Sequence, residues 1–269
     1  LYVQPKNKID VLFLGSSHVH CNVNTQLLWD EYGMAAYLMT GAEQPLWNSY
    51  YNLKEALKTQ KPKLVVLDMF CPSRFYDDFQ PGWADENLDG MRISLNKLEA
   101  VYTSVQEEQS HFFLGFTEYH SRYDQLTTED FQNFVWNRKT QERWKGYTPL
   151  NRHAELTEPD MSHVTTSQEM TEKSKEYFEK IVELTKKEGI ALALISGPYL
   201  LEERDQEVYN SIGQLAEKDG LLFWNTNTPA HYREMGLDFS TDYADHAHLN
   251  EAGGAKYTAY LGKWLSQNY

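Results

Sequence analysis

Residues 9–17 read IDVLFLGSS, a nearly continuous apolar run that ends at a glycine and two serines. Continuous apolar runs of this length are typical of strands that are buried on both faces of a parallel sheet. Similar runs follow at 63–69 (KLVVLDM) and 190–196 (IALALIS), with shorter ones at 35–39 and 221–224. The sequence therefore predicts about five parallel strands.

Helical patterns lie between these strands. The expected helices cover 24–32, 45–58, 167–187, 203–218 and 251–266. Gly33 and Gly189 suit the ends of the first and third of them, because glycine readily adopts the left-handed conformation that closes a helix. Alternating strands and helices predict an α/β fold, a three-layer α/β/α doubly wound sheet of the flavodoxin-like type.

The alternation breaks between residues 71 and 165. This stretch is rich in aromatic residues, histidine and charge, and it could hold helices at 95–106 and 128–144. A stretch of this length within an α/β pattern favours a mainly helical, cap-like insertion inside a single domain of residues 1–269. The insertion leaves from the end of the third strand, the sheet edge at which open α/β sheets place their ligands.

The charge balance narrows the class of partner. The 269 residues include 25 Lys and Arg against 39 Asp and Glu, a formal net charge of −14. An acidic surface repels phosphate groups, so we expect neither nucleic acid nor anionic lipid as a partner of this chain.

The two cysteines, Cys21 and Cys71, match no metal-ligand spacing. Both follow predicted strands, so a disulfide between them is an alternative to the two free thiols that we expect. No stretch approaches the roughly 20 apolar residues of a membrane span, and no signal peptide is visible. Because the chain starts at Leu1, close to its first strand, we expect that an N-terminal signal or anchor lies outside it.

Two short motifs carry the chemistry. Gly15-Ser16-Ser17 follows the first strand, and Asp245-His246-Ala247-His248 precedes the last helix. A serine at the carboxyl end of a strand is exposed at the sheet edge. An aspartate three residues before a histidine can orient the imidazole, which can then take the serine proton. Together the motifs predict a triad of Ser17, His248 and Asp245, whereas alone each could be a turn or a helix cap.

With these residues the sequence resembles the SGNH (GDSL-like) hydrolase superfamily. That family has a nucleophilic serine in a Gly-Asp-Ser or Gly-Ser-Ser block and an Asp-x-x-His block before its final helix, which match Gly15–Ser17 and Asp245–His248. The phrase DHAHLNEAGGAKYT is typical of the second block. The resemblance is closest to the branch of alginate and cell-wall polysaccharide O-acetyltransferases and DltD-like proteins, which often act outside the cytoplasm behind an N-terminal anchor.

The resemblance also implies an oxyanion hole made by the Ser17 N–H, a glycine and an asparagine. Gly41, after the second strand, fits the glycine block. The Gly-x-Asn-Asp block is absent, because the third strand runs instead into Asp68-Met69-Phe70-Cys71-Pro72-Ser73-Arg74. Gln44, Arg74 or a residue of the insertion are candidates for the third donor, since the loss of one donor typically costs about 10²–10³ in rate.

Other residues have weaker functional interpretations. Residues that could contact a substrate are His18, Trp47, Arg74, His120 and Arg122, although Trp47 is more often a core residue and His120 and Arg122 more often belong to a packed cap helix. An alternative chemistry is a metal-dependent hydrolase, with ligands drawn from His18, His20, Asp245, His246 and His248. A catalytically inactive domain that binds a glycan or a protein partner is a further alternative.

The resemblance implies a serine esterase or O-acyltransferase that needs no cofactor or metal. Its substrate would be an acyl ester, most simply an acetyl ester, of a cell-envelope polysaccharide or related glycan, and a membrane-bound acyltransferase could be its partner. The implied location is the cell surface, outside the cytoplasm. Hydrolysis and transfer share an acyl-enzyme, so the motifs do not distinguish them.

Overall fold

The structure is a computed structural model that describes residues 1–74, 81–106, 109–113 and 143–269. Its centre is a five-stranded parallel sheet in the order β2-β1-β3-β4-β5. The strands are β1 (Val11–Gly15), β2 (Ala36–Thr40), β3 (Leu64–Asp68), β4 (Ala191–Ser196) and β5 (Leu222–Asn225). This arrangement confirms the predicted α/β fold, and every strand starts one or two residues after its predicted start.

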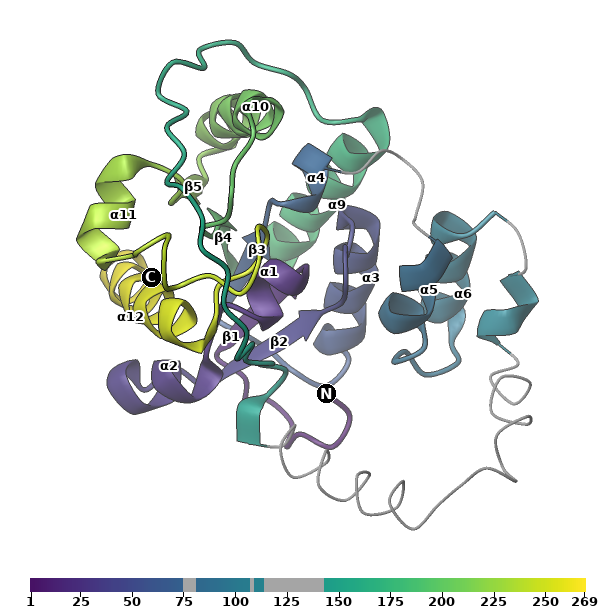
Figure 1. Cartoon of the computed structure of the whole chain (residues 1–269). Coiled ribbons are helices and arrows are strands. Elements are labelled where there is room, and N and C mark those ends of the chain that lie inside the picture. The colour runs from purple at the N-terminus through teal and green to yellow at the C-terminus, as the bar shows by residue number, and fades with distance from the viewer. Residues whose placement is uncertain (75–80, 107–108, 114–142) are drawn as a thin grey trace, which may run out of the picture.

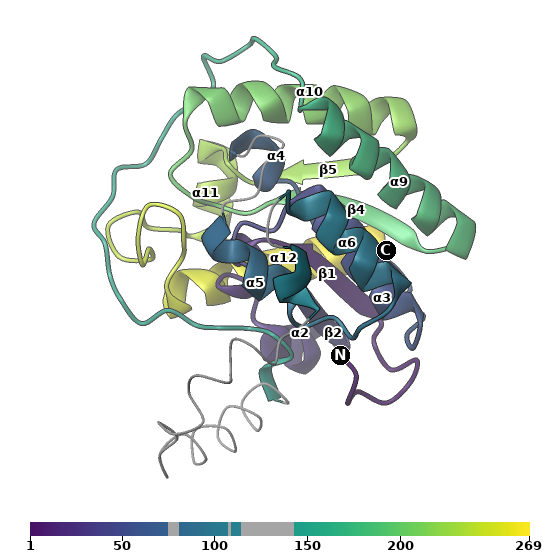
Figure 2. The same ribbon diagram turned by 90° about the vertical axis from the view of Figure 1, so that its right-hand side faces the viewer.

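Helices cover both faces of the sheet (Figures 1 and 2). Leu12 and Leu14 of β1 point toward α3 (Leu46–Leu57), α9 (Glu172–Glu188) and α10 (Glu203–Asp219). The alternate residues Val11 and Phe13 point toward α2 (Thr25–Tyr32), α11 (Pro229–Met235) and α12 (Glu251–Asn268). Because side chains alternate along a strand, this sheet buries one hydrophobic layer on each side.

Short-range signals set the helix ends. The Asn24 side chain accepts hydrogen bonds from the backbone of Gln26 and Leu27, and Gly33 closes α2 with φ 65°. Helix α9 begins at Glu172, after its cap Thr171, so the predicted start at Ser167 was five residues too early. Helix α11 was not among the predicted helices, although Thr228 caps it, Pro229 lies in its first turn and Gly236 follows its last turn.

After β3 the chain forms α4 (Cys71–Arg74), α5 (Pro81–Leu88), α6 (Leu95–Ser104) and the 3₁₀ helix η1 (Gln109–Phe112). Helix α6 confirms the helix predicted at 95–106, and it packs on α3, away from the sheet (Figure 2). The helix predicted at 128–144 lies outside the described residues except for its last two. The single domain with residues 71–165 as a cap-like insertion stays a prediction.

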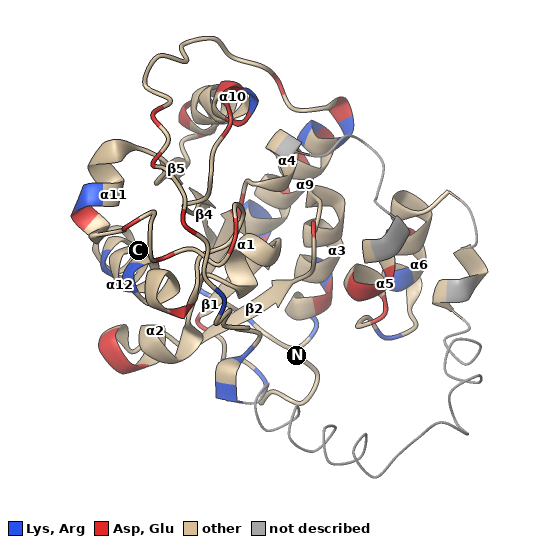
Figure 3. Cartoon of the chain, in the orientation of Figure 1, with Lys and Arg blue, Asp and Glu red and all other residues tan. Residues whose placement is uncertain are grey.

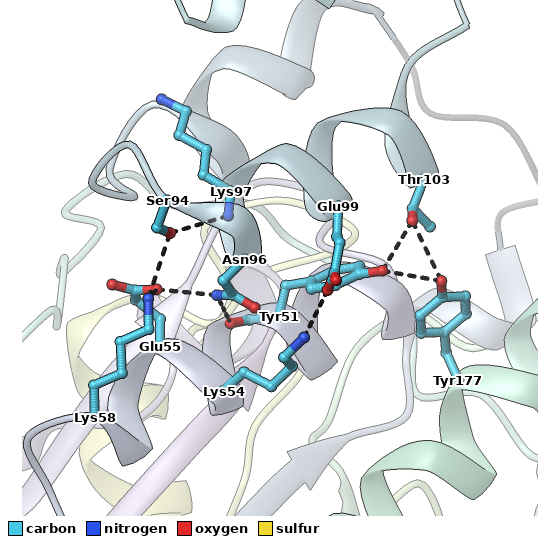
Figure 4. A network of polar contacts seen from close by, with 10 residues as sticks. All are labelled: Tyr51, Lys54, Glu55, Lys58, Ser94, Asn96, Lys97, Glu99, Thr103 and Tyr177. Atoms are coloured by element: carbon cyan, nitrogen blue, oxygen red, sulfur yellow. Dashed lines mark hydrogen bonds and ion pairs between the residues drawn. The ribbon is translucent and has the colours of Figure 1, made fainter.

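Polar contacts hold α6 against α3 (Figure 4). Asn96 Nδ2 donates to the Tyr51 carbonyl and to Glu55 Oε2, both at 3.0 Å. Glu55 is buried, with 3% of its side chain exposed, and the Tyr2 hydroxyl also donates to it. The Lys54–Glu99 ion pair at the same interface is much more exposed. The buried contacts therefore carry more of the interface stability than the ion pair does.

We predict that Asn96→Ala lowers the free energy of unfolding by about 1–3 kcal/mol, because buried acceptors lose their donor. Glu99→Gln on the same helix should cost less than about 1 kcal/mol, since an exposed ion pair is weak. Urea denaturation of both variants measures the difference. Equal losses in the two variants would contradict the importance of the buried network.

The acidic residues are spread over several elements (Figure 3). Among the described residues, no helix is long and apolar enough to cross a membrane. Cys21 and Cys71 are both buried and unpaired, in agreement with the expected free thiols. Burial raises the pKa of the Cys21 thiol to about 12 and that of Cys71 well above its ordinary value, so both thiols are protonated at neutral pH.

Candidate active site

The predicted nucleophile lies in a tight turn between β1 and the short helix α1 (Ser17–His20). Gly15 ends the strand with φ 151°, and a Cβ at this position would lie 2.4 Å from Asp68 Cβ. A side chain here would be strained and would also collide with β3, so the turn requires glycine. Ser16 caps α1, and its hydroxyl accepts from the His18 N–H. The cap directs Ser16 inward and leaves Ser17 half-buried at the sheet edge.

Ser17, His248 and Asp245 lie in hydrogen-bonding contact. His248 Nε2 is 2.8 Å from Ser17 Oγ, and His248 Nδ1 is 2.9 Å from Asp245 Oδ1. The same Asp245 oxygen accepts from the backbone N–H groups of Ala247 and His248. The structure thus brings together the three residues that the sequence singled out, in the order that a serine, a base and an orienting acid require.

Asp245 is held in its charged form. Partial burial opposes ionisation, but the Ala247 N–H, His248 and the Arg152 guanidinium together lower the pKa of Asp245 below its ordinary value. The Arg152 Nη2 atom is 2.6 Å from Asp245 Oδ2, the oxygen that does not contact His248. A charged carboxylate can orient the imidazole and stabilise its protonated form. Arg152 was not singled out from the sequence, because it lies in the irregular stretch before α9.

A second carboxylate lies beneath the turn. Asp68, at the end of β3, is 3% exposed and accepts from the hydroxyl and the N–H of Ser16 at 2.8 and 3.3 Å. Burial raises the pKa of Asp68 to about 6, against the opposing effect of the Ser16 and Phe70 hydrogen bonds. Asp68 therefore braces the residue that precedes Ser17. From the sequence, Asp68 had no predicted role and was named only in the segment that replaces the Gly-x-Asn-Asp block.

The neighbouring histidines have different surroundings. His18 is 3% exposed and stacks on Phe70, with ring centroids 3.6 Å apart, so it lies in the core and not at the surface of the site. His20 Nδ1 is 3.3 Å from Thr40 Oγ1, and burial, with His248 nearby, lowers the pKa of His20 to about 4. His246 is exposed, and its carbonyl accepts from the Leu200 N–H.

These positions do not favour the metal alternative. Within the described part of the chain, no three His, Cys, Asp or Glu side chains are grouped in a way that could hold a metal ion. Both ring nitrogens of His248 already contact Ser17 and Asp245, and His18 is stacked in the core. The residues proposed as ligands therefore lie near one another, but the ring nitrogens of His248 are engaged in other contacts.

The predicted oxyanion residues are placed unequally. Gly41 lies at the same sheet edge, and its N–H donates to the Gly15 carbonyl over a long 3.3 Å. Gln44 is 2% exposed, and its amide group donates to the Met39 carbonyl and to Ser49 Oγ. Because its two hydrogens are used inside the protein, Gln44 does not face the site as a free donor. Arg74 ends α4, and its side chain lies outside the described residues.

The remaining residues predicted to contact a substrate lie away from the triad or outside the described residues. Trp47 is 1% exposed and belongs to the core beneath α3, with the Lys173 ammonium 4.1 Å from its ring centroid. Its position agrees with a core residue and not with a pocket wall. His120 and Arg122 lie outside the described residues.

No protein-family model and no curated protein matches the sequence. Among solved structures, a catalytic mutant of Axe2, an acetylxylan esterase from Geobacillus stearothermophilus, is 11% identical and covers 98% of this chain and 96% of its own, with a TM-score of 0.47. A predicted acylhydrolase from Bacteroides fragilis is 13% identical and covers 99% of this chain and 92% of its own, also with a TM-score of 0.47. Values this low establish neither a family nor an activity for this chain.

We predict a pH-dependent contribution of Asp68 to stability. Between its ordinary pKa of 3.8 and its native value of about 6, the folded protein keeps a proton that the unfolded chain has released. Folding stability from this group therefore falls as pH rises through that window, by up to about 3 kcal/mol. Asp68→Asn, which does not titrate, should lack this fall.

Urea denaturation of the wild type and Asp68→Asn from about pH 4 to about pH 8 measures the effect. The free energy of unfolding of the wild type should decline relative to that of the variant as pH rises. Parallel curves for the two proteins would show that Asp68 ionises as it does in the unfolded chain.

Proposed function

We propose that the protein is a serine-dependent acyl-ester hydrolase or acyltransferase of the SGNH type. The observation that carries the proposal is the continuous contact from Ser17 Oγ through the His248 ring to Asp245 Oδ1, with distances of 2.8 and 2.9 Å. The position of Ser17 at the carboxyl end of β1, beside β2 and β3, supports it, because open α/β sheets bind ligands at this edge.

In the proposed reaction, Ser17 Oγ attacks the ester carbonyl while His248 Nε2 takes the serine proton. The tetrahedral intermediate collapses, the bond to the alcohol breaks, and His248 gives its proton to the departing alkoxide. The acyl group is then on Ser17. Water or a second alcohol attacks it in the same way, with His248 again accepting and returning a proton, and the acid or a new ester leaves.

The negative oxygen of the intermediate needs donors near Ser17. The Ser17 N–H starts α1, where backbone N–H groups have no partner within the helix. We assign it as one donor and the Gly41 N–H as a second, since the 3.3 Å bond from Gly41 to the Gly15 carbonyl is a weak competitor. Gln44 is not assigned as the third donor, because its amide hydrogens are already used.

The substrate class in this proposal is a small acyl ester, most simply acetyl, on a polysaccharide of the cell envelope. Its support is the similarity of the blocks around Ser17 and His248 to those of polysaccharide O-acetyltransferases. The same similarity suggests a membrane-bound acyltransferase as partner and a location outside the cytoplasm. An assay with an acetylated glycan and a free oligosaccharide acceptor separates the two reactions: hydrolysis releases acetate, whereas transfer gives an acetylated acceptor that mass spectrometry detects.

We predict that Ser17→Ala and His248→Ala each lower kcat for p-nitrophenyl acetate by at least about 10³-fold, since members of a triad act as a unit. His246→Ala is the matched control, because this exposed histidine lies in the same loop, two residues from His248. Its rate should equal that of the wild type. Equal rates for wild type and Ser17→Ala would disprove the nucleophile, and a rate lost in His246→Ala and restored by added zinc would favour metal chemistry.

A further inference from the structure

Between β3 and α9, part of the irregular stretch passes across β1 and α1 (Figure 1). Residues 145–156 make up this crossing, and we call them the strap. The Lys145 carbonyl accepts from the Leu38 N–H of β2 at 2.9 Å, and the Thr148 N–H donates to the His20 carbonyl of α1 at 2.7 Å. The strap is therefore fixed to the strand beside Ser17 and to the helix that Ser17 begins.

The other end of the strap is fixed to the loop that carries Asp245 and His248. The Leu150 carbonyl accepts from the Glu251 N–H at 3.0 Å, and the Ala154 N–H donates to the Tyr243 carbonyl at 2.9 Å. The Ala154–Tyr243 contact is a short antiparallel bridge. Arg152 lies between these two anchors, so its backbone is held in place on both sides.

The two oxygens of Asp245 have different partners. Oδ1 accepts from His248 Nδ1 and from the backbone of Ala247 and His248, whereas Oδ2 lies 2.6 Å from Arg152 Nη2. Rotation of the carboxylate would break both sets of contacts together. The side chains are 63% exposed for Arg152 and 26% for Asp245, so the ion pair contributes little to stability. Its effect falls instead on the orientation and charge of Asp245.

We propose that Arg152 is a positioning residue for the triad. Through its contact with Asp245, Arg152 orients His248 and partly neutralises the negative charge that Asp245 presents to the imidazole. This inference rests on the proposed function of Ser17 and His248. Arg152 belongs to the strap and not to the two sequence blocks, Gly15–Ser17 and Asp245–His248, that carry the triad. Arg152 need not contact the substrate.

Electrostatics sets the direction of the effect. Besides Arg152 of the strap, the titratable groups around His248 and Asp245 are His18 and His20 of α1 and Cys21 directly after α1, whereas His246 of the same loop is exposed. Arginine stays protonated at every pH of interest. Without it, Asp245 would present its full negative charge to the imidazole, and protonation of His248 would become easier. The acidic limb of kcat/KM should then move to higher pH.

The experiment compares Arg152→Met and Arg152→Lys with the wild type, using the pH dependence of p-nitrophenyl acetate hydrolysis. Arg152→Met should lower kcat/KM about 10-fold and move the acidic limb up by about 0.5 pH unit, as a unit charge roughly 6 Å away predicts at high dielectric. Arg152→Lys should return the limb toward its wild-type position, and 1 M salt should reduce the difference between the profiles. Lys145→Met removes another cation of the strap and should leave the profile unchanged.

If Arg152→Met lowers kcat/KM but leaves the acidic limb of the pH profile in place, the proposal is wrong, because disruption of the strap alone would explain the lower rate. An unchanged rate and limb would overturn it as well. The His248 ring resonances, followed by NMR against pH, give a readout that does not need turnover, and they should change at higher pH in Arg152→Met. If they do so while Ser17→Ala retains the wild-type rate, the proposed function fails but the action of Arg152 on His248 stands.

Discussion

The hydrogen bond between Ser17 Oγ and His248 Nε2 joins residues 231 positions apart, and the rest of the site depends on it. Contacts between the two ends of the chain keep it in place. The Leu249 N–H donates to Asn22 Oδ1, and the Thr258 hydroxyl of α12 donates to the Asn22 carbonyl while accepting from the Asn24 N–H. The connector after α1 is thus bound directly to the last helix. These bonds, together with the parallel sheet, keep the segments that carry Ser17 and His248 next to each other.

Two carboxylates near Ser17 have opposite environments and therefore different roles. Asp68 is buried, and its burial raises its pKa to about 6. Its side chain accepts a hydrogen bond from the Ser16 hydroxyl, so its role is to hold the residue that caps α1. Asp245 is partly solvated and surrounded by donors, which lower its pKa despite partial burial. A negative charge at neutral pH is therefore assured at Asp245, beside the imidazole that must become cationic during the proposed reaction.

Local patterns in the sequence predicted the strands and the chemistry-bearing residues, because both depend on short stretches. The run before Gly15 is typical of a buried strand, and a serine after such a strand is expected at the sheet edge, as is the loop before the last helix. The strap and the roles of Asp68 and Arg152 could not be predicted, since they arise from contacts between segments with no periodicity. Gln44 was a reasonable oxyanion donor by position, but only the fold reveals that Met39 and Ser49 use its hydrogens.

The contact with His248 distinguishes Ser17 from the adjacent Ser16 and activates it as a nucleophile in the proposed reaction. Covalent labelling with a fluorophosphonate, followed by peptide mass spectrometry, tests this activation directly, because such reagents react with serines activated by a base. We expect one adduct per chain, located on Ser17 and abolished in His248→Ala but not in His246→Ala. A folded wild-type protein that takes up no label, or one labelled equally after Ser17→Ala, would contradict this activation.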